Sequence, residues 1–410
     1  MRNLALVLAM AVALALGSAH DTLRLSPVQR LSFRYQYDFV TWEATHFPAK
    51  WLHWLWARGF PFFQTPQFLL AGRDTVQTYF QLKQEAESLR GELERAAAVG
   101  STNPSNMEQR LRSLDRQIED IRPWVEEALE AAVSDTLRQQ KVPLSAGKLV
   151  FPPVDFSLDS LPTILVTSKR DRIQRLDDSL LVSDITPRER EALEDSIASQ
   201  ANLSALVEGL GGISTYPAIV SSTGLRDVLV TASHEWLHNY LFFKPLGQSY
   251  WNNSDMSTIN ETTANIFGEE LGDMVYARLT GEKPSPARAP GAPAPPCPPT
   301  QFCFDQQMRQ TRAQAEQLLA QGKVDEAEAY MEERRRVFVE NGYLIRKLNQ
   351  AYFAFHGTYA DSPASTSPIY DQLLEVRRAS SSLGAFIHRV AGISSYSELT
   401  DMLQRIQANR

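Results

Sequence analysis

The sequence predicts an α+β protein that is mostly helical, and three observations support this prediction. Apolar residues recur at helical spacing through long stretches of the N-terminal and C-terminal parts of the chain. A central stretch instead has short apolar runs bounded by turn residues, which is typical of strands. The 410 residues are 43% hydrophobic and 22% charged, which is ordinary for a globular protein and argues against bulk disorder.

Residues 1–19 have the layout of a secretory signal peptide or an N-terminal membrane anchor. Arg2 supplies a positive charge, residues 4–16 are an unbroken apolar run, and small residues at 17–19 fit a cleavage site after Ala19. The run is shorter than the about 20 apolar residues that span a bilayer, which favours a cleaved signal. Either interpretation predicts an exported protein, periplasmic or extracellular, and an anchor would associate it with a membrane.

Residues 20–147 form a predicted helical N-terminal region. Within it, 73–141 should be a helical hairpin, because apolar residues recur at helical spacing on both sides of a break at 100–104. The other positions of the hairpin are charged, so we expect a structural element, with a partner-binding arm as the alternative.

Residues 148–280 form the predicted mixed core. We expect strands at 149–154, 162–167 and 213–220, and a helix over 186–210. The net charge of −7, without any clustered basic surface, excludes nucleic acid as a partner.

The last third of the chain begins with a proline-rich linker over 281–304 and continues as a helical C-terminal region over 305–410. The linker contains Cys297 and Cys303, which predict one local disulfide in an exported protein.

The chemistry is concentrated in a His-Glu-x-x-His motif formed by His234, Glu235 and His238. Residues four apart on a helix point to the same side, so the two histidines could hold one metal ion. Glu235 would lie beside the open coordination position and could take a proton from metal-activated water. Apolar neighbours without proline predict a helix here, which should begin at capping residues in 221–223. The alternative is a chance match on a surface helix.

A hydrolytic metal site needs a third protein ligand, with the fourth position left for water. No histidine follows nearby, so an acidic ligand is expected. Glu261 is the leading candidate, since it lies on a predicted helix over 258–278 that can return beside the first, and Glu269 is the alternative. Asn265 shares a helix face with Glu261 and could orient a metal-bound histidine from behind.

His-Glu-x-x-His followed by Asn-Glu-x-x-Ala on a second helix resembles the gluzincin metallopeptidases, which include thermolysin-like proteases and zinc aminopeptidases. The resemblance implies a zincin-like catalytic core, zinc as the cofactor, and Glu235 as the general base. It also implies that His234, His238 and Glu261 are the zinc ligands.

A second resemblance covers 348–351 and 357–359, which are similar to the C-terminal part of a bacterial family of proposed zinc aminopeptidases. Aminopeptidase action is implied by this resemblance alone. Such an enzyme must anchor a free amine, for which Glu269 or Glu270 is available. The N-terminal third carries no such resemblance.

Hydrolysis also needs a donor that stabilises the developing oxyanion. Tyr359 is our candidate, with Tyr352 and His356 as alternatives, and residues 211–216 could form an edge strand that pairs with an extended peptide. The sequence therefore predicts a zinc metallopeptidase acting on a peptide or protein. The alternatives are an envelope interaction protein with a structural or vestigial zinc site, and a zinc hydrolase of a non-peptide bond.

Overall fold

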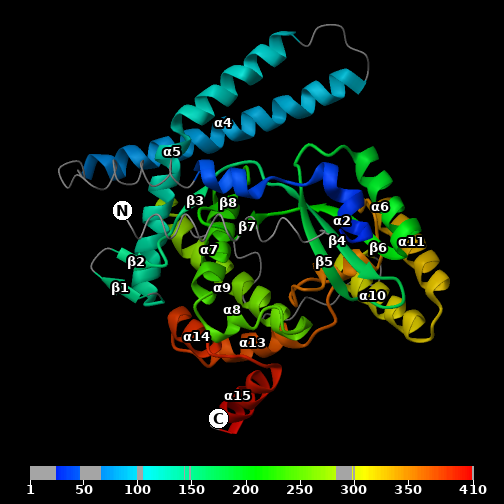
Figure 1. Ribbon diagram of the computed structural model, residues 1–410. Coiled ribbons are helices and arrows are strands. Elements are labelled where there is room, and N and C mark those ends of the chain that lie inside the picture. The colour runs from blue at the N-terminus through cyan, green and yellow to red at the C-terminus, as the bar shows by residue number, and fades with distance from the viewer. Residues whose placement is uncertain are drawn as a thin grey trace, which may run out of the picture.

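The computed structural model describes residues 25–46, 66–98, 105–142, 144–146, 149–282, 298 and 301–408. These residues form an α+β fold in which helices predominate and the strands form small sheets, which confirms the predicted fold class (Figure 1). The targeting segment predicted at 1–19 and most of the predicted linker lie outside these residues. Within the described parts of the chain, no helix is both long and apolar enough to cross a membrane.

A long antiparallel hairpin forms most of the N-terminal region. It consists of α4 (Pro66–Ala98) and α5 (Ser105–Gln140), and much of both helices projects beyond the rest of the molecule (Figure 1). Tyr79 of α4 and Leu114 of α5 are fully buried where the helices pack together. The hairpin follows the short α2 (Pro27–Ser32) and the 3-10 turn η1 (Phe33–Tyr35).

One antiparallel sheet has the order β5-β4-β6, with β4 (Thr163–Lys169) between β5 (Arg175–Leu181) and β6 (Leu203–Gly209). Leu165 packs with α2 and α6 (Pro187–Ala201) on one face, and Val166 packs with Phe355 of α12 (Gln350–His356) on the other. The helix predicted over 186–210 is therefore too long. It ends at Asn202, which adopts a left-handed conformation with φ 54°, and the chain then enters β6.

A second sheet has the order β3-β8-β7 and stands beside the His-Glu-x-x-His helix. β3 (Phe156–Ser157) runs parallel to β8 (Ala218–Val220), and β7 (Gly212–Ile213) runs antiparallel to β8. The single strand predicted at 213–220 is thus two short strands joined by a turn. The strand predicted at 149–154 is β2 (Leu149–Phe151), which pairs with β1 (Leu144–Ala146).

The two edges of this second sheet differ. At the β3 edge, Glu130 of α5 accepts a hydrogen bond from Phe156 N at 3.0 Å, and Glu126 accepts one from Leu158 N at 2.8 Å. These carboxylates satisfy backbone donors that would otherwise attract another strand. At the β7 edge, no further strand is paired within the described residues.

Two helices form the centre of the molecule. α7 (Leu225–Leu241) carries the histidine motif, and α9 (Ser254–Thr280) returns beside it after the short α8 (Pro245–Gln248). The helices approach closely at Gly272, where a Cβ would lie 2.7 Å from Val230 Cα. The N-cap predicted at 221–223 is wrong, because the N-cap of α7 is Gly224, which has no side chain to cap the helix. Ser222 Oγ instead accepts a hydrogen bond from Gly224 N at 3.1 Å.

The C-terminal region is helical, as predicted. A hairpin of α10 (Phe304–Ala320) and α11 (Val324–Glu340) precedes α12 (Gln350–His356). Three shorter helices follow: α13 (Ile369–Arg378), α14 (Leu383–Val390) and α15 (Tyr396–Ala408). Cys303, just before α10, is disulfide-bonded, and the chain's other cysteine, Cys297, lies outside the described residues.

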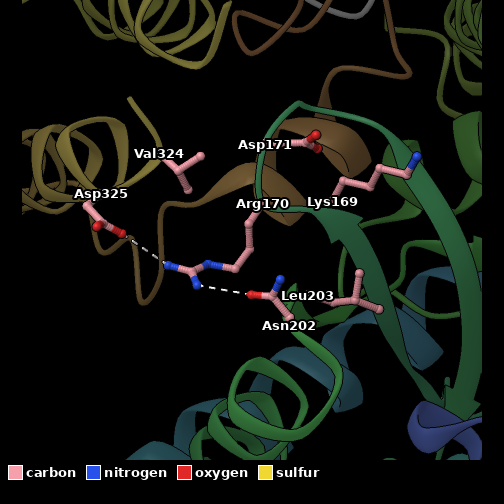
Figure 2. A pocket seen from close by; sticks show the side chains of 7 residues that line it. All are labelled: Lys169, Arg170, Asp171, Asn202, Leu203, Val324 and Asp325. Carbon is pink, nitrogen blue, oxygen red and sulfur yellow. Dashed lines mark hydrogen bonds and ion pairs between the residues drawn. The ribbon is translucent and has the colours of Figure 1, made fainter. Parts of the chain in front are cut away.

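A hollow of about 420 Å³ lies where the end of β4 meets the start of α11 (Figure 2). Arg170 crosses it and pairs with Glu328 at 2.6 Å and with Asp325 at 3.5 Å, and it donates to Asn202 Oδ1 at 3.2 Å. The guanidinium is thus already engaged by two carboxylates and an amide, which fits a junction that holds the α10–α11 hairpin to the sheet.

Candidate metal centre

The structure brings the motif histidines and the predicted third ligand together. His234 Nε2 and His238 Nε2 lie 2.9 Å apart. Glu261 Oε2 lies 3.5 Å from the first of these nitrogens and 3.4 Å from the second. Their side chains come from adjacent faces of α7 and α9, and with Glu235 the two histidines form a group that could hold a metal ion.

Glu261 is held as a ligand would be. Its Oε1 accepts a hydrogen bond from the Tyr250 hydroxyl at 2.7 Å, whereas its buried Oε2 has no hydrogen-bond partner in the described structure. Burial raises the pKa of the Glu261 carboxyl, but the positive charges of His238 and His234 outweigh this effect and hold the pKa well below its usual value. A buried anionic oxygen that faces two imidazole nitrogens and has no donor of its own fits a bound cation.

Glu235 lies in a confined position beside β7. A Cβ added to Gly212 would lie 2.5 Å from Glu235 Oε1, so only glycine leaves room for the carboxylate in this geometry. Burial raises the pKa of Glu235, while the charges of His234 and His238 lower it in part. The carboxylate is therefore easier to protonate than an exposed one, which suits a group that must accept a proton and release it again.

The turn that follows β7 is fixed to the motif helix. Ser214 Oγ donates to the backbone oxygen of Glu235 at 3.0 Å, and Asn239 Nδ2 donates to the backbone oxygen of Thr215 at 3.2 Å. These bonds fix the position of β7 along the axis of α7, so the strand stays next to Glu235, the general-base candidate.

A loop from the C-terminal region forms another wall. Thr262 Oγ1 accepts a hydrogen bond from Ala360 N at 3.0 Å, which fixes the loop next to the third-ligand candidate. Tyr359, in this loop, has its ring centroid 6.4 Å from that of His234. The negative charge of Glu261, together with burial and Glu235, raises the pKa of Tyr359 well above its usual value, so its hydroxyl stays protonated and able to donate.

The other oxyanion-donor candidates lie in a different setting. Tyr352 and His356 pack against each other on α12 with ring centroids 4.3 Å apart. Burial raises the pKa of Tyr352 and lowers that of His356, and the acidic group that acts on both side chains is Glu208. The acidic groups that raise the pKa of Tyr359 are instead Glu261 and Glu235. Tyr359 is thus the candidate that shares the histidine site.

The remaining acidic candidates on α9 have cationic partners. Glu269 pairs with Arg226, and Glu270 pairs with Arg377 at 2.8 Å. Glu269, two turns beyond Glu261, is thereby engaged away from the histidines. Asn265 donates to both carboxylate oxygens of Asp361, at 3.0 and 3.1 Å, rather than to a motif histidine as predicted.

Sequence reasoning missed Tyr250 and Asp361. Tyr250 belongs to the connection between the two helices, where no periodic pattern indicates which side chains turn inward. Asp361 is two residues after Tyr359. Desolvation by the surrounding protein, with the charge of Glu269, raises the pKa of its carboxyl, although the hydrogen bond from Asn265 and the charge of His234 lower it in part. Its position two residues after Tyr359 was the one sequence signal that could have placed Asp361 near the site.

Comparisons with family models, with curated proteins and with solved structures returned no match to this chain, so its functional interpretation rests on the residues and their geometry.

Proposed function

We propose that the protein is a zinc-dependent metallopeptidase with a zincin-like core, in which His234, His238 and Glu261 hold the ion and Glu235 is the general base. The observation that carries this proposal is the convergence of two imidazole nitrogens and one carboxylate oxygen with separations of 2.9–3.5 Å. The resemblance of the two motifs to gluzincins points the same way.

The donor set fits zinc. Zinc binds imidazole nitrogen and carboxylate oxygen at about 2.0–2.2 Å, so ligand atoms at neighbouring corners of a tetrahedron lie about 3.3–3.6 Å apart. The two distances to Glu261 Oε2 fall in or close to this range, and the shorter nitrogen–nitrogen distance differs from it by a few tenths of an ångström. Two histidines, one glutamate and an open fourth position are the pattern of a hydrolytic zinc site rather than a structural one.

Bound zinc supplies Lewis-acid chemistry, which activates water and polarises a carbonyl. Glu235 accepts a proton from the attacking water while the oxygen of that water forms a bond to the amide carbon. The same carboxyl then delivers that proton to the departing amine nitrogen when the C–N bond breaks. The raised pKa of Glu235 favours this alternation.

Tyr359 would act on the carbonyl oxygen. Its hydroxyl remains protonated because neighbouring negative charges disfavour the phenolate. A hydrogen bond from Tyr359 to the carbonyl oxygen would strengthen as negative charge develops there, which lowers the barrier rather than merely binding substrate.

An extended peptide would pair with the β7 edge. The opposite edge of this sheet is occupied by carboxylates of α5, whereas β7 has no strand on its outer side within the described residues. Backbone pairing there would place a peptide alongside Glu235, whose carboxylate lies where a side chain on Gly212 would otherwise be.

The two alternative functions, a structural zinc site and a hydrolase of a non-peptide bond, explain fewer features of the site. A structural zinc site has no use for a buried carboxylate beside the open position, and such sites are normally closed by four protein ligands. A zinc hydrolase of a non-peptide bond would use the same machinery, but it would leave the open β7 edge without a role. Export, and action on a peptide or protein outside the cytoplasm, is proposed on the sequence of residues 1–19 alone.

The test measures metal content by mass spectrometry and activity on a mixed peptide library, for the parent and a Glu235→Gln variant. We expect about one zinc per chain in both proteins and cleavage by the parent only. Cleavage by both proteins, or no zinc under replete conditions, would overturn the proposal. Glu261→Gln should lose most of the bound zinc, whereas Glu269→Gln should retain it and serves as the matched control.

A further inference from the structure

Asp361 differs from the other acidic residues around α9. Glu269 and Asp273 share Arg226, and Glu270 pairs with Arg377. Asp361 is hydrogen-bonded to the neutral amide of Asn265, and no cationic side chain pairs with it among the described residues. The residue is exposed, so its carboxylate can be reached from solvent even though neighbouring groups partly desolvate it.

The position of Asp361 relative to the metal site is fixed by α9. Asn265 follows Glu261 by four residues, which corresponds to about 6 Å along the helix axis. Thr262, next to Glu261, holds the backbone at Ala360. The carboxylate is therefore presented about one helical turn from the third-ligand candidate, in the same loop as Tyr359, and close enough for the charge of His234 to act on it.

The hydrogen bonding of Asp361 leaves capacity for a ligand. One amide nitrogen contacts both carboxylate oxygens, which orients the group but leaves most of its acceptor sites unused. A carboxylate held in one orientation, open to solvent and without a counter-charge, is suited to accept charge-assisted hydrogen bonds from an ammonium or guanidinium group.

We propose that Asp361 anchors a positively charged group of the substrate close to the scissile bond, and that Asn265 is the residue that positions it. This inference rests on the proposed peptidase function. The cation is either the free α-ammonium of a peptide or the side chain of a lysine or arginine. We therefore place the amine anchor at Asp361 rather than at Glu269 or Glu270, whose carboxylates already form ion pairs with Arg226 and Arg377.

The kinetic test compares kcat/KM for matched peptides in the parent, Asp361→Asn and Glu269→Gln proteins. One pair of peptides differs in a free or acetylated N-terminus, and a second pair has arginine or glutamine beside the scissile bond. The parent should prefer one cationic member by about tenfold or more, because a charge-assisted hydrogen bond is lost with the other. Asp361→Asn should bring that ratio close to one, Asp361→Glu should restore part of it, and Glu269→Gln should keep it.

A preference for the free N-terminus would identify an α-ammonium anchor, and a preference for arginine would identify a side-chain anchor. A parent without either preference, or an Asp361→Asn protein that retains the full preference, would overturn the inference while leaving peptidase action intact.

A binding measurement separates this inference from the proposed function. Calorimetry on the zinc-loaded Glu235→Gln protein would use leucine amide, its acetylated form and acetylated arginine amide as probes. We expect one cationic probe to bind, and to bind at least about tenfold more weakly when Asp361→Asn is added. Equal binding with and without Asp361, or no binding of either cationic probe, would contradict the inference whether or not the parent cleaves peptides.

Discussion

The hydroxyl of Tyr250 donates a hydrogen bond to Oε1 of Glu261 at 2.7 Å, and this bond leaves Oε2 to face the two imidazoles. In the proposed metal site, Glu261 would thus have one oxygen for orientation and one for the ion. Residues that orient a ligand in this way commonly affect metal affinity strongly, although they do not touch the metal.

Replacing Tyr250 by phenylalanine should therefore weaken zinc binding without unfolding the protein. We expect a loss of about 10- to 100-fold in affinity, measured by competition with a chromophoric chelator. Tyr330→Phe, on the distant α11, is the matched control and should leave the affinity unchanged. An unchanged affinity for Tyr250→Phe would show that the hydrogen bond does not orient the ligand.

Tyr359→Phe should lower kcat by about 100- to 1000-fold, because it removes one hydrogen bond to a developing oxyanion. KM and zinc content should change little, since the bond strengthens mainly in the transition state. Tyr352→Phe is the control, as its ring packs on His356 and its pKa responds to Glu208 rather than to Glu261. Equal losses in the two variants would rule out a specific role for Tyr359.

Gly212→Ala should reduce activity severely and leave zinc binding intact. The new methyl group would lie 2.5 Å from Glu235 Oε1 and 2.7 Å from Thr231 Cγ2, so the carboxylate or the strand must move. The accompanying loss of stability should be about 1–3 kcal/mol, as for other overpacked sites. Gly211→Ala offers a control one residue away, where a Cβ would meet nothing within 4 Å. Steady-state kinetics and thermal unfolding of both variants would check the contrast.

A pH-dependent contribution to stability is expected from Glu194, whose side chain is fully buried between Arg346 at 2.6 Å and Lys347 at 2.9 Å. Burial raises the pKa of Glu194, but the hydrogen bond from Arg346 and the charge of Lys347 outweigh it, so the pKa lies below the ordinary value of 4.5. Because the folded-state pKa is lowered, the contribution is present above the unfolded-state value and is lost as the pH falls below about 4.5.

Denaturant unfolding of the parent and of Glu194→Gln, at several pH values, would measure this contribution. At neutral pH the variant should be less stable by about 1–3 kcal/mol, which is the cost of losing hydrogen bonds between charged groups. The difference should shrink below pH 4.5 as the parent's carboxylate is protonated. Glu191→Gln, an exposed position on the same helix, should show no such trend.

The local parts of the site were predictable because they depend on helix geometry. His234 and His238 share a face of α7 through their spacing of four, and the separation from Glu261 allows α9 to return beside them. The helical hairpin over 73–141 was predictable for the same reason, since its break is marked by Gly100 and Pro104.

Features set by tertiary contacts were less predictable. The sequence of residues 203–209 is compatible with an extension of α6. They form a strand instead because they can pair with the backbone of β4 along its whole length. Tyr250 and Asp361 reach the site through the α7–α9 connection and a loop held by Thr262 and Asn265. No local periodicity describes such segments, so their contribution depends on how distant elements pack.

The carboxylates of α5 also bear on how copies of this protein could associate. Glu130 and Glu126 accept hydrogen bonds from Phe156 N in β3 and from Leu158 N just after it, so strand addition to this sheet is blocked at that edge. Among the described residues, no strand pairs with the outer side of β7, which is the edge left for such pairing. Two copies that joined their β7 edges would cover the Glu235 side of both candidate metal centres. Self-association through this sheet would therefore compete with substrate, and specific activity should fall as protein concentration rises if such dimers form.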